Sequence, residues 1–170
     1  PAKDWVRVRT LLGGICGTDL AIIAQKPPPD SLLQGYSSMP MIFGHENVSV
    51  VDQVGPGVDR SWVGRRVLVE PTLGCEARGT HPRCERCAAG EFGACENFSG
   101  DMGGSAGIPA GTSIGYNSRT GGSWGEYFVA HESQLVPVDE RLSDEEAVLV
   151  DPLSCSLHGV LMPDLSGVRR

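Results

Sequence analysis

Three features that point to common classes of protein are missing from this sequence. The longest run of purely apolar residues, 20–24, is far shorter than the roughly 20 residues that a membrane-spanning helix needs. Basic residues are outnumbered, 14 against 21 acidic ones, and the net charge of −7 repels phosphate backbones. The first residues contain no hydrophobic signal core. The sequence therefore predicts no membrane and no nucleic acid as partners, and it favours a cytoplasmic location.

Composition favours one globular domain that is built mainly from strands. Hydrophobic residues make up 40% of the 170 residues and charged residues 21%, which is ordinary for a globular chain. There are 23 glycines and 12 prolines, so turns and short strands are favoured over long helices. Partial alternation at 4–12 and β-branched residues at 47–54 predict strands, and further strands are expected at 65–71, 121–130 and 134–138.

Short helices are predicted at both ends of the chain. Residues 18–26 favour a helix that is capped by Thr18 or Asp19 and stopped by the prolines at 27–29. Residues 143–146 read S-x-x-E, a capping box before an apolar run. We therefore expect helices over about 144–149 and about 152–162, with Asp151-Pro152 between them.

Four of the six cysteines lie in one glycine-broken loop, at positions 75, 84, 87 and 95. The C-x2-C spacing of Cys84 and Cys87 lets two thiolates face one centre, and Cys95 adds a third for a zinc tetrahedron. Cys75 is the expected fourth ligand, with His81 as its competitor. Two disulfides or free thiols are the alternatives, but no secretion signal favours disulfides. Four protein ligands would close such a site, so the prediction is a structural zinc.

A series of motifs covers almost the whole chain in a specific order. GICGTD at 14–19 and GHE at 44–46 precede the cysteine loop, and GEYF and VDPLSCSLHGV follow it. In this order they resemble the zinc-dependent alcohol and polyol dehydrogenases of the medium-chain family. The resemblance implies a GroES-like, partly open barrel over residues 1–155, with a zinc-binding loop lobe at about 72–98. Residues 156–170 are then expected to form a linker helix to an absent nucleotide-binding domain.

The resemblance also implies a second, catalytic zinc. Cys16 and His45 match two of its ligands, and Glu46 is either a further exchanging ligand or a neighbouring carboxylate. Asp151 stands where polyol-type members carry the glutamate of an E-P-L segment. It is one methylene shorter, so Cys155 stays open as a substitute, as does the absence of a third ligand in this chain.

Two residues between the motifs have implied supporting roles. Asp19 would accept a hydrogen bond from the His45 ring and fix its tautomer. The Thr18 hydroxyl would relay the proton of the alcohol. The zinc-bound alkoxide that results would then give hydride to a nicotinamide. Capping of a surface helix is the alternative for both residues. His158 matches a histidine that is frequent in the polyol branch, but a packed helical histidine is the simpler interpretation.

The nucleotide-binding fingerprint of the family is missing. The chain has no G-x-G-x-x-G, since Gly55-Pro56-Gly57 carries a proline and is followed by Arg60 in the third glycine place. NAD or NADP is therefore expected only in a longer, probably homo-oligomeric protein, and the 170 residues alone are expected to be inactive. Gly17 and Ala21 depart from the ethanol branch, which favours a polyol, threonine or sugar alcohol as the small-molecule substrate. The alternative is a non-catalytic zinc-binding interaction module.

Overall fold

The computed structural model describes residues 1–24, 39–99 and 104–161. The expected helix stop at prolines 27–29 and the last residues of the expected linker, 162–170, lie outside these ranges. The mainly β prediction is confirmed, because the described chain is organised around one five-stranded antiparallel sheet with a few short helices.

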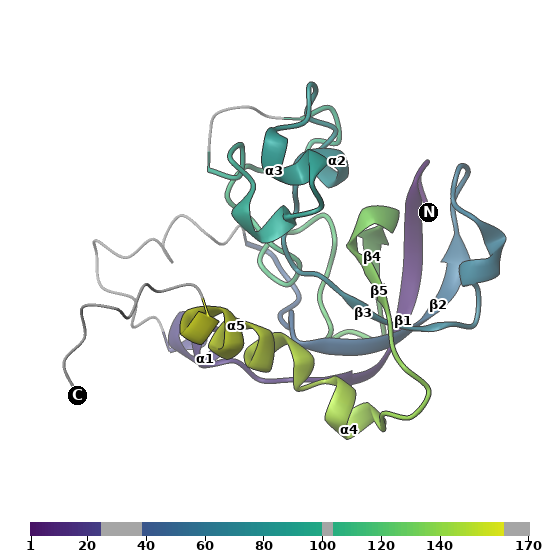
Figure 1. Ribbon diagram of the computed structural model, residues 1–170, viewed down its shortest axis with the longest axis vertical. Coiled ribbons are helices and arrows are strands. Elements are labelled where there is room, and N and C mark those ends of the chain that lie inside the picture. Colours follow the sequence, from purple (N-terminus) through teal and green to yellow (C-terminus); the bar gives the residue numbers. More distant parts are fainter. Residues whose placement is uncertain (25–38, 100–103, 162–170) are drawn as a thin grey trace.

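The strands form an open sheet in the order β4-β1-β2-β3-β5 (Figure 1). Strands β4 and β5 are its two edges, so the sheet does not close into a complete barrel. The bounds are β1 (Trp5–Gly13), β2 (Asn47–Val54), β3 (Arg66–Val69), β4 (Tyr127–His131) and β5 (Leu135–Pro137).

The described residues form five α-helices, with α2 and α3 at one end of the molecule and α4 and α5 toward the other (Figure 1). They are α1 (Gly17–Ile23), α2 (Cys75–Arg78), α3 (Glu85–Ala88), α4 (Asp144–Ala147) and α5 (Val150–Leu161). Within the described residues, 3₁₀ turns lie at Arg60–Trp62, Phe92–Ala94 and Glu132–Gln134. None of these described helices has the length and apolar character that crossing a membrane requires.

The hydrophobic core lies on one face of the sheet and extends under the cysteine loop. Its fully buried members include Val6 and Val8 of β1, Val67 of β3, and Leu73 and Ile114 from the long connection. In a smaller hydrophobic cluster, α4 packs against β2 through Val48, Ala147 and Val148. Helix α5 contributes nothing to either core, because none of its residues is buried.

The strand expected at 121–130 is shorter than predicted. Pairing with β1 begins only at Tyr127, and residues 121–126 form turns. Gly121 has a φ of +73°, which a strand residue does not adopt. The glycines of this segment therefore make a tight turn against the site described below instead of extending the sheet.

The helix boundaries also differ from the prediction at two places. Asp151 and Pro152 do not separate two helices but lie in the first turn of α5, where a proline is tolerated because that N–H has no intrahelical acceptor. The cap of α1 is Cys16, not Thr18 or Asp19. Asp19 is the third helical residue, and its carboxylate accepts the Cys16 N–H at 3.0 Å.

The Asn47 side chain fastens β2 to β3 where their ladder ends. It is 3% exposed, its Oδ1 accepts the Val69 N–H at 3.1 Å, and its Nδ2 donates to the Val69 carbonyl at 3.0 Å. The same Nδ2 donates to the carbonyl of His45 at 2.9 Å. One amide therefore replaces a missing pair of ladder bonds and also fixes the backbone just before β2.

Replacing Asn47 should cost more stability than its size suggests. Asn47→Ala leaves both backbone groups of Val69 buried without partners, so we expect the free energy of unfolding to fall by about 2–3 kcal/mol. Urea denaturation measures this. Gln53→Ala, at an exposed position of the same strand, is the matched control and should change little; an equal loss in both variants would contradict the role of the amide.

Candidate metal centres

Four cysteine sulfurs gather in the lobe that α2 and α3 form. The sulfurs of Cys75, Cys84, Cys87 and Cys95 all lie within 4.8 Å of one another, and those of Cys75 and Cys95 are 3.7 Å apart. Sulfurs bound to one tetrahedral zinc at about 2.3 Å would lie about 3.8 Å from each other, whereas a disulfide is about 2.05 Å long. All six cysteines are free thiols. These four, called the sulfur cluster below, therefore fit one tetrahedral metal ion and not two disulfides.

Each sulfur of the cluster faces an N–H donor. The N–H of Cys75 lies 3.4 Å from the Cys87 sulfur, and that of Cys87 lies 3.4 Å from the Cys84 sulfur. The Asn97 amide donates to Cys75 at 3.4 Å. Donors aimed at sulfur favour the thiolate form, and the Cys87 N–H lowers the pKa of Cys84 to about 6. Burial acts in the opposite direction and raises the pKa of Cys87 and of Cys95, so a bound cation is needed to hold these two sulfurs as thiolates.

The structure brings Cys75 into the cluster and leaves His81 outside it. Cys75 is fully buried at the start of α2. His81 is exposed and lines a separate surface pocket together with Glu76. Of the two candidates for the fourth position, only Cys75 has the required placement.

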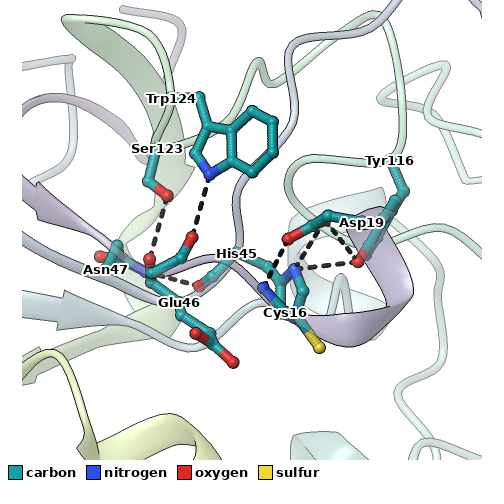
Figure 2. Close-up of polar contacts among 9 residues, drawn as sticks. Cys16, Asp19, His45, Glu46, Asn47, Tyr116, Ser123 and Trp124 are labelled. Atoms are coloured by element: carbon teal, nitrogen blue, oxygen red, sulfur yellow. Dashed lines mark hydrogen bonds and ion pairs between the residues drawn. The ribbon is translucent and has the colours of Figure 1, made fainter. Parts of the chain in front are cut away.

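A second group contains Cys16, His45 and Glu46, and is called the mixed group below. One ligand atom from each lies within 4.8 Å of the others, and all three residues are half-buried (Figure 2). Cys16 immediately precedes α1, and His45 and Glu46 immediately precede β2. All three residues of the mixed group are therefore partly exposed, whereas three of the four cysteines of the sulfur cluster are buried.

Two glycines make room for the mixed group. Gly44 has a φ of +98°, a conformation that turns the chain into His45 and that side chains with a Cβ rarely adopt. A Cβ on Gly14 would lie 2.1 Å from the Glu46 carboxylate. Glycine at these positions therefore lets the Cys16 and His45 segments approach each other.

The turn at 121–126 holds the two segments in place. The Ser123 hydroxyl donates to the carbonyl of Glu46 at 3.0 Å, and the Trp124 indole donates to the carbonyl of Gly14 at 2.9 Å (Figure 2). The Trp124 ring also packs on Phe43 at 5.6 Å between centroids. One turn thus joins the segment before α1 to the segment before β2.

A buried tyrosine lies between Asp19 and His45. The Tyr116 hydroxyl donates to Asp19 Oδ1 at 2.9 Å and lies 3.0 Å from His45 Nδ1 (Figure 2). His45 Nδ1 is 3.6 Å from the same carboxylate oxygen, beyond hydrogen-bonding distance. The expected direct bond from His45 to Asp19 is therefore replaced by a relay through Tyr116. Since the single phenol proton points to Asp19, the oxygen accepts Nδ1–H, which leaves Nε2 as the metal-binding nitrogen of a neutral ring.

Charges around this relay favour a proton on the histidine in the metal-free chain. Burial by itself lowers the pKa of His45, but the neighbouring Asp19 carboxylate more than offsets it and raises the pKa to about 9. Burial and the Asp19 charge together raise the pKa of Tyr116, so the phenol keeps its proton at neutral pH. Any metal at this site must displace the His45 proton.

The remaining predicted residues lie around the mixed group but not within it. Asp151 is half-buried in the first turn of α5. Burial raises the pKa of Asp151. The charge of His45 lowers this pKa, and the charges of Glu70 and Glu46 raise it, so Asp151 lies within electrostatic range of the group. Cys155 is exposed.

Thr18 and His158 have contrasting surroundings. Thr18 is half-buried in the first turn of α1, two residues after Cys16. His158 is exposed on α5, so the expected packed helical histidine is wrong.

Sequence reasoning missed Tyr116, Ser123 and Trp124. Their positions follow from the way the long connection folds back over the sheet, and no motif marks Tyr116. The GGSW sequence at 121–124 did carry a turn signal, since Gly-Gly pairs mark turns.

Comparisons with known proteins agree with these features. The model of the alcohol dehydrogenase GroES-like domain matches residues 2–140. An L-threonine 3-dehydrogenase of Rhizobium etli is 32% identical over 162 residues, which are 95% of this chain and 40% of that protein.

Solved structures share the fold over a similar range. The alcohol dehydrogenase RspB of Escherichia coli CFT073, complexed with NADH, is 27% identical with a TM-score of 0.66, over 96% of this chain and 40% of its own. The 2R,3R-butanediol dehydrogenase of Bacillus subtilis is 25% identical with a TM-score of 0.64, over 96% and 42%.

The chain spans about 40% of the length of these relatives. The shared part contains the sheet, the sulfur cluster and the mixed group. By the match over residues 2–140, the chain belongs to the alcohol dehydrogenase family and contains its GroES-like domain.

Proposed function

We propose that this chain is the metal-binding, substrate-activating part of a zinc-dependent dehydrogenase that oxidises a secondary alcohol or polyol with NAD or NADP. The observation that carries the proposal is the mixed group, where a thiol, an imidazole and a carboxylate from two distant segments converge within 4.8 Å. An interaction module that needs zinc only for its structure has no use for this second, open group. The sulfur cluster alone would serve it.

The donor atoms suit zinc, which binds cysteine sulfur, histidine nitrogen and carboxylate oxygen. Cys16, His45 and Glu46 would hold the catalytic ion, with Asp151 from α5 as a further ligand. A bound zinc would lower the pKa of a substrate hydroxyl group, so that it loses its proton near neutral pH. The sulfur cluster would hold the structural ion in a closed site.

The chain's own residues then position and deprotonate the substrate. Tyr116 and Asp19 orient the His45 ring so that Nε2 faces the metal. Thr18, two residues after Cys16 in the first turn of α1, would accept the proton of the substrate hydroxyl while its own hydroxyl proton leaves toward solvent. The contacts of Tyr116 with Asp19 and His45 support the part of this proposal that concerns the histidine.

Two relatives support a secondary alcohol as the substrate class. Threonine at its third carbon and 2R,3R-butanediol at both central carbons carry a secondary hydroxyl group, and both proteins are named as dehydrogenases of these compounds. The relative complexed with NADH supports a nicotinamide as hydride acceptor. In the proposal, the nicotinamide site lies outside these 170 residues, which contain no G-x-G-x-x-G motif.

Metal content tests the proposal directly. We expect two zinc ions per chain, of which mild chelation removes one quickly and the other slowly, because the mixed group is half-buried and the sulfur cluster is closed. Elemental analysis before and after chelation measures this. Cys16→Ser should remove the exchangeable ion alone, and Cys87→Ser the tightly held one.

Cys155→Ser, at the exposed cysteine, is the matched control and should keep both ions. A chain that holds only the tightly bound ion, at zinc concentrations that saturate the relatives, would count against the catalytic assignment and favour an interaction module.

The affinity of the mixed group for zinc should rise with pH up to about 9. The His45 proton must leave when the metal binds, and its pKa of about 9 lies well above the ordinary 6.5. From this proton alone the affinity should rise about tenfold per pH unit below that pKa and level off above it. Competition with a chelator between neutral and alkaline pH measures the profile.

Asp19→Asn removes the charge that raises this pKa and should move the plateau to lower pH. Asp52→Asn is the matched control, because Asp52 pairs with Arg7 at 2.7 Å on the sheet, away from the group. An unchanged profile in Asp19→Asn would show that the Asp19 charge does not set the protonation of His45.

The 170-residue chain by itself should not oxidise an alcohol. With zinc, a secondary diol and NAD or NADP, we expect no formation of reduced nicotinamide above background, because no residue here holds the cofactor in the proposal. Absorbance of the reduced cofactor measures this, with a full-length relative as positive control. Measurable alcohol-dependent reduction would place a nicotinamide site within these residues.

A further inference from the structure

The segment between Cys75 and Cys84 carries a fully buried arginine. Arg78 is the last residue of α2 and is 0% exposed. Its Nη2 lies 3.9 Å from the Cys95 sulfur and also donates to the carbonyl of Asn97. Its Nε and Nη1 have no hydrogen-bond partner. The guanidinium is therefore buried against the sulfur cluster with most of its donors unused.

The backbone closes over this arginine. Gly104 lies so near that a Cβ there would be 1.7 Å from the Arg78 carbonyl oxygen. This contact fixes the backbone of Arg78, and its full burial distinguishes the side chain from a long surface side chain that reaches water with its charged end.

A buried guanidinium needs a compensating negative charge. Within the described residues no carboxylate forms an ion pair with Arg78. The two other arginines of the lobe behave differently, because Arg83 pairs with Glu76 and Arg86 pairs with Glu91 at 2.8 Å, both in exposed positions. Among the described residues, the acidic side-chain group that Arg78 contacts is the thiol of Cys95.

The charge of the loaded cluster matches this requirement. Four thiolates around one Zn²⁺ carry a net charge of −2. Neutral donors approach all four sulfurs, since backbone N–H groups reach Cys84, Cys87 and Cys95 and the Asn97 amide reaches Cys75. Among the described residues, Cys95 is the one whose sulfur also lies beside a buried cation, at 3.9 Å. The lobe therefore supplies one buried positive charge to a site that has two negative charges to balance.

We propose that Arg78 is the counter-charge of the sulfur cluster and sets how tightly the cluster holds its metal ion. The proposal rests on the structural zinc site proposed above. Arg78 is a positioning and charge-balancing residue here, and it does not touch substrate. Without the metal, neutral thiols would leave its charge buried and uncompensated, so closure of the lobe and metal loading should occur together.

The test compares Arg78→Gln, which keeps hydrogen-bonding capacity but no charge, with Arg78→Lys, which keeps the charge. Zinc affinity of the 170-residue chain is measured by competition with a chromophoric chelator. The sulfur-to-metal charge-transfer bands are recorded after cobalt(II) replaces the tightly held ion. Arg83→Gln and Arg86→Gln are the matched controls in the same lobe.

We expect Arg78→Gln to lower the affinity of the tightly held ion by about 10–100-fold, the usual effect of losing a partner of a metal ligand, and to shift the charge-transfer bands. Arg78→Lys should retain most of the affinity, and the two controls all of it. The exchangeable ion at the mixed group should be unaffected in every variant, which shows that the rest of the chain is folded.

Equal affinities in Arg78→Gln and the wild type, or equal losses in the glutamine and lysine variants, would overturn the proposal. If the glutamine variant does not fold, the lysine variant decides: retained affinity supports the charge balance and lost affinity refutes it. A wild-type chain without a tightly held ion would instead refute the proposed structural zinc, so the two failures are distinguishable.

Discussion

The antiparallel pairing of β1 with β2 is the constraint on which the mixed group depends. The ladder ends where Gly13 faces Asn47, and the next hydrogen bond runs from the Gly14 N–H to the Glu46 carbonyl at 2.9 Å. Both ligand segments leave the sheet at this end, so residues far apart in the sequence start from adjacent backbone positions. The turn that contains Trp124 adds a second fixed point. A register shift of one residue would move the ligands to opposite faces.

The two candidate metal sites differ in what surrounds their donor atoms. In the sulfur cluster, helix-terminal N–H groups and Asn97 approach the sulfurs from a buried lobe, so the ligand shell is complete without solvent. In the mixed group, the supporting contacts go to backbone carbonyls and to the far nitrogen of His45, and the three ligand residues stay partly exposed. This difference separates a site that maintains structure from one that can admit a substrate oxygen.

The spacing of residues in the sequence predicted the features that depend on neighbouring residues. It did not predict the features that depend on contacts between distant segments. The C-x2-C turn, the capping box at 143–146 and the strand near the N-terminus all depend on neighbouring residues, and the structure has them. The glycine-rich segment at 121–126 was expected to belong to a strand, but contact with residues 43–46 bends it into a turn. Tyr116 could not be found, because its role exists only once three separate segments pack together.

The relay through Tyr116 changes how the Asp19 charge reaches the histidine. A carboxylate in direct contact would hold the Nδ1 proton by a charge-assisted bond, whereas here a neutral phenol makes that contact and the charge acts from 3.6 Å. The tautomer is still fixed, because the phenol has one proton and gives it to Asp19. The ring orientation and the ring charge are therefore controlled by different residues. Tyr116 controls the first through geometry, and Asp19 controls the second through its field, which allows each to be altered without the other.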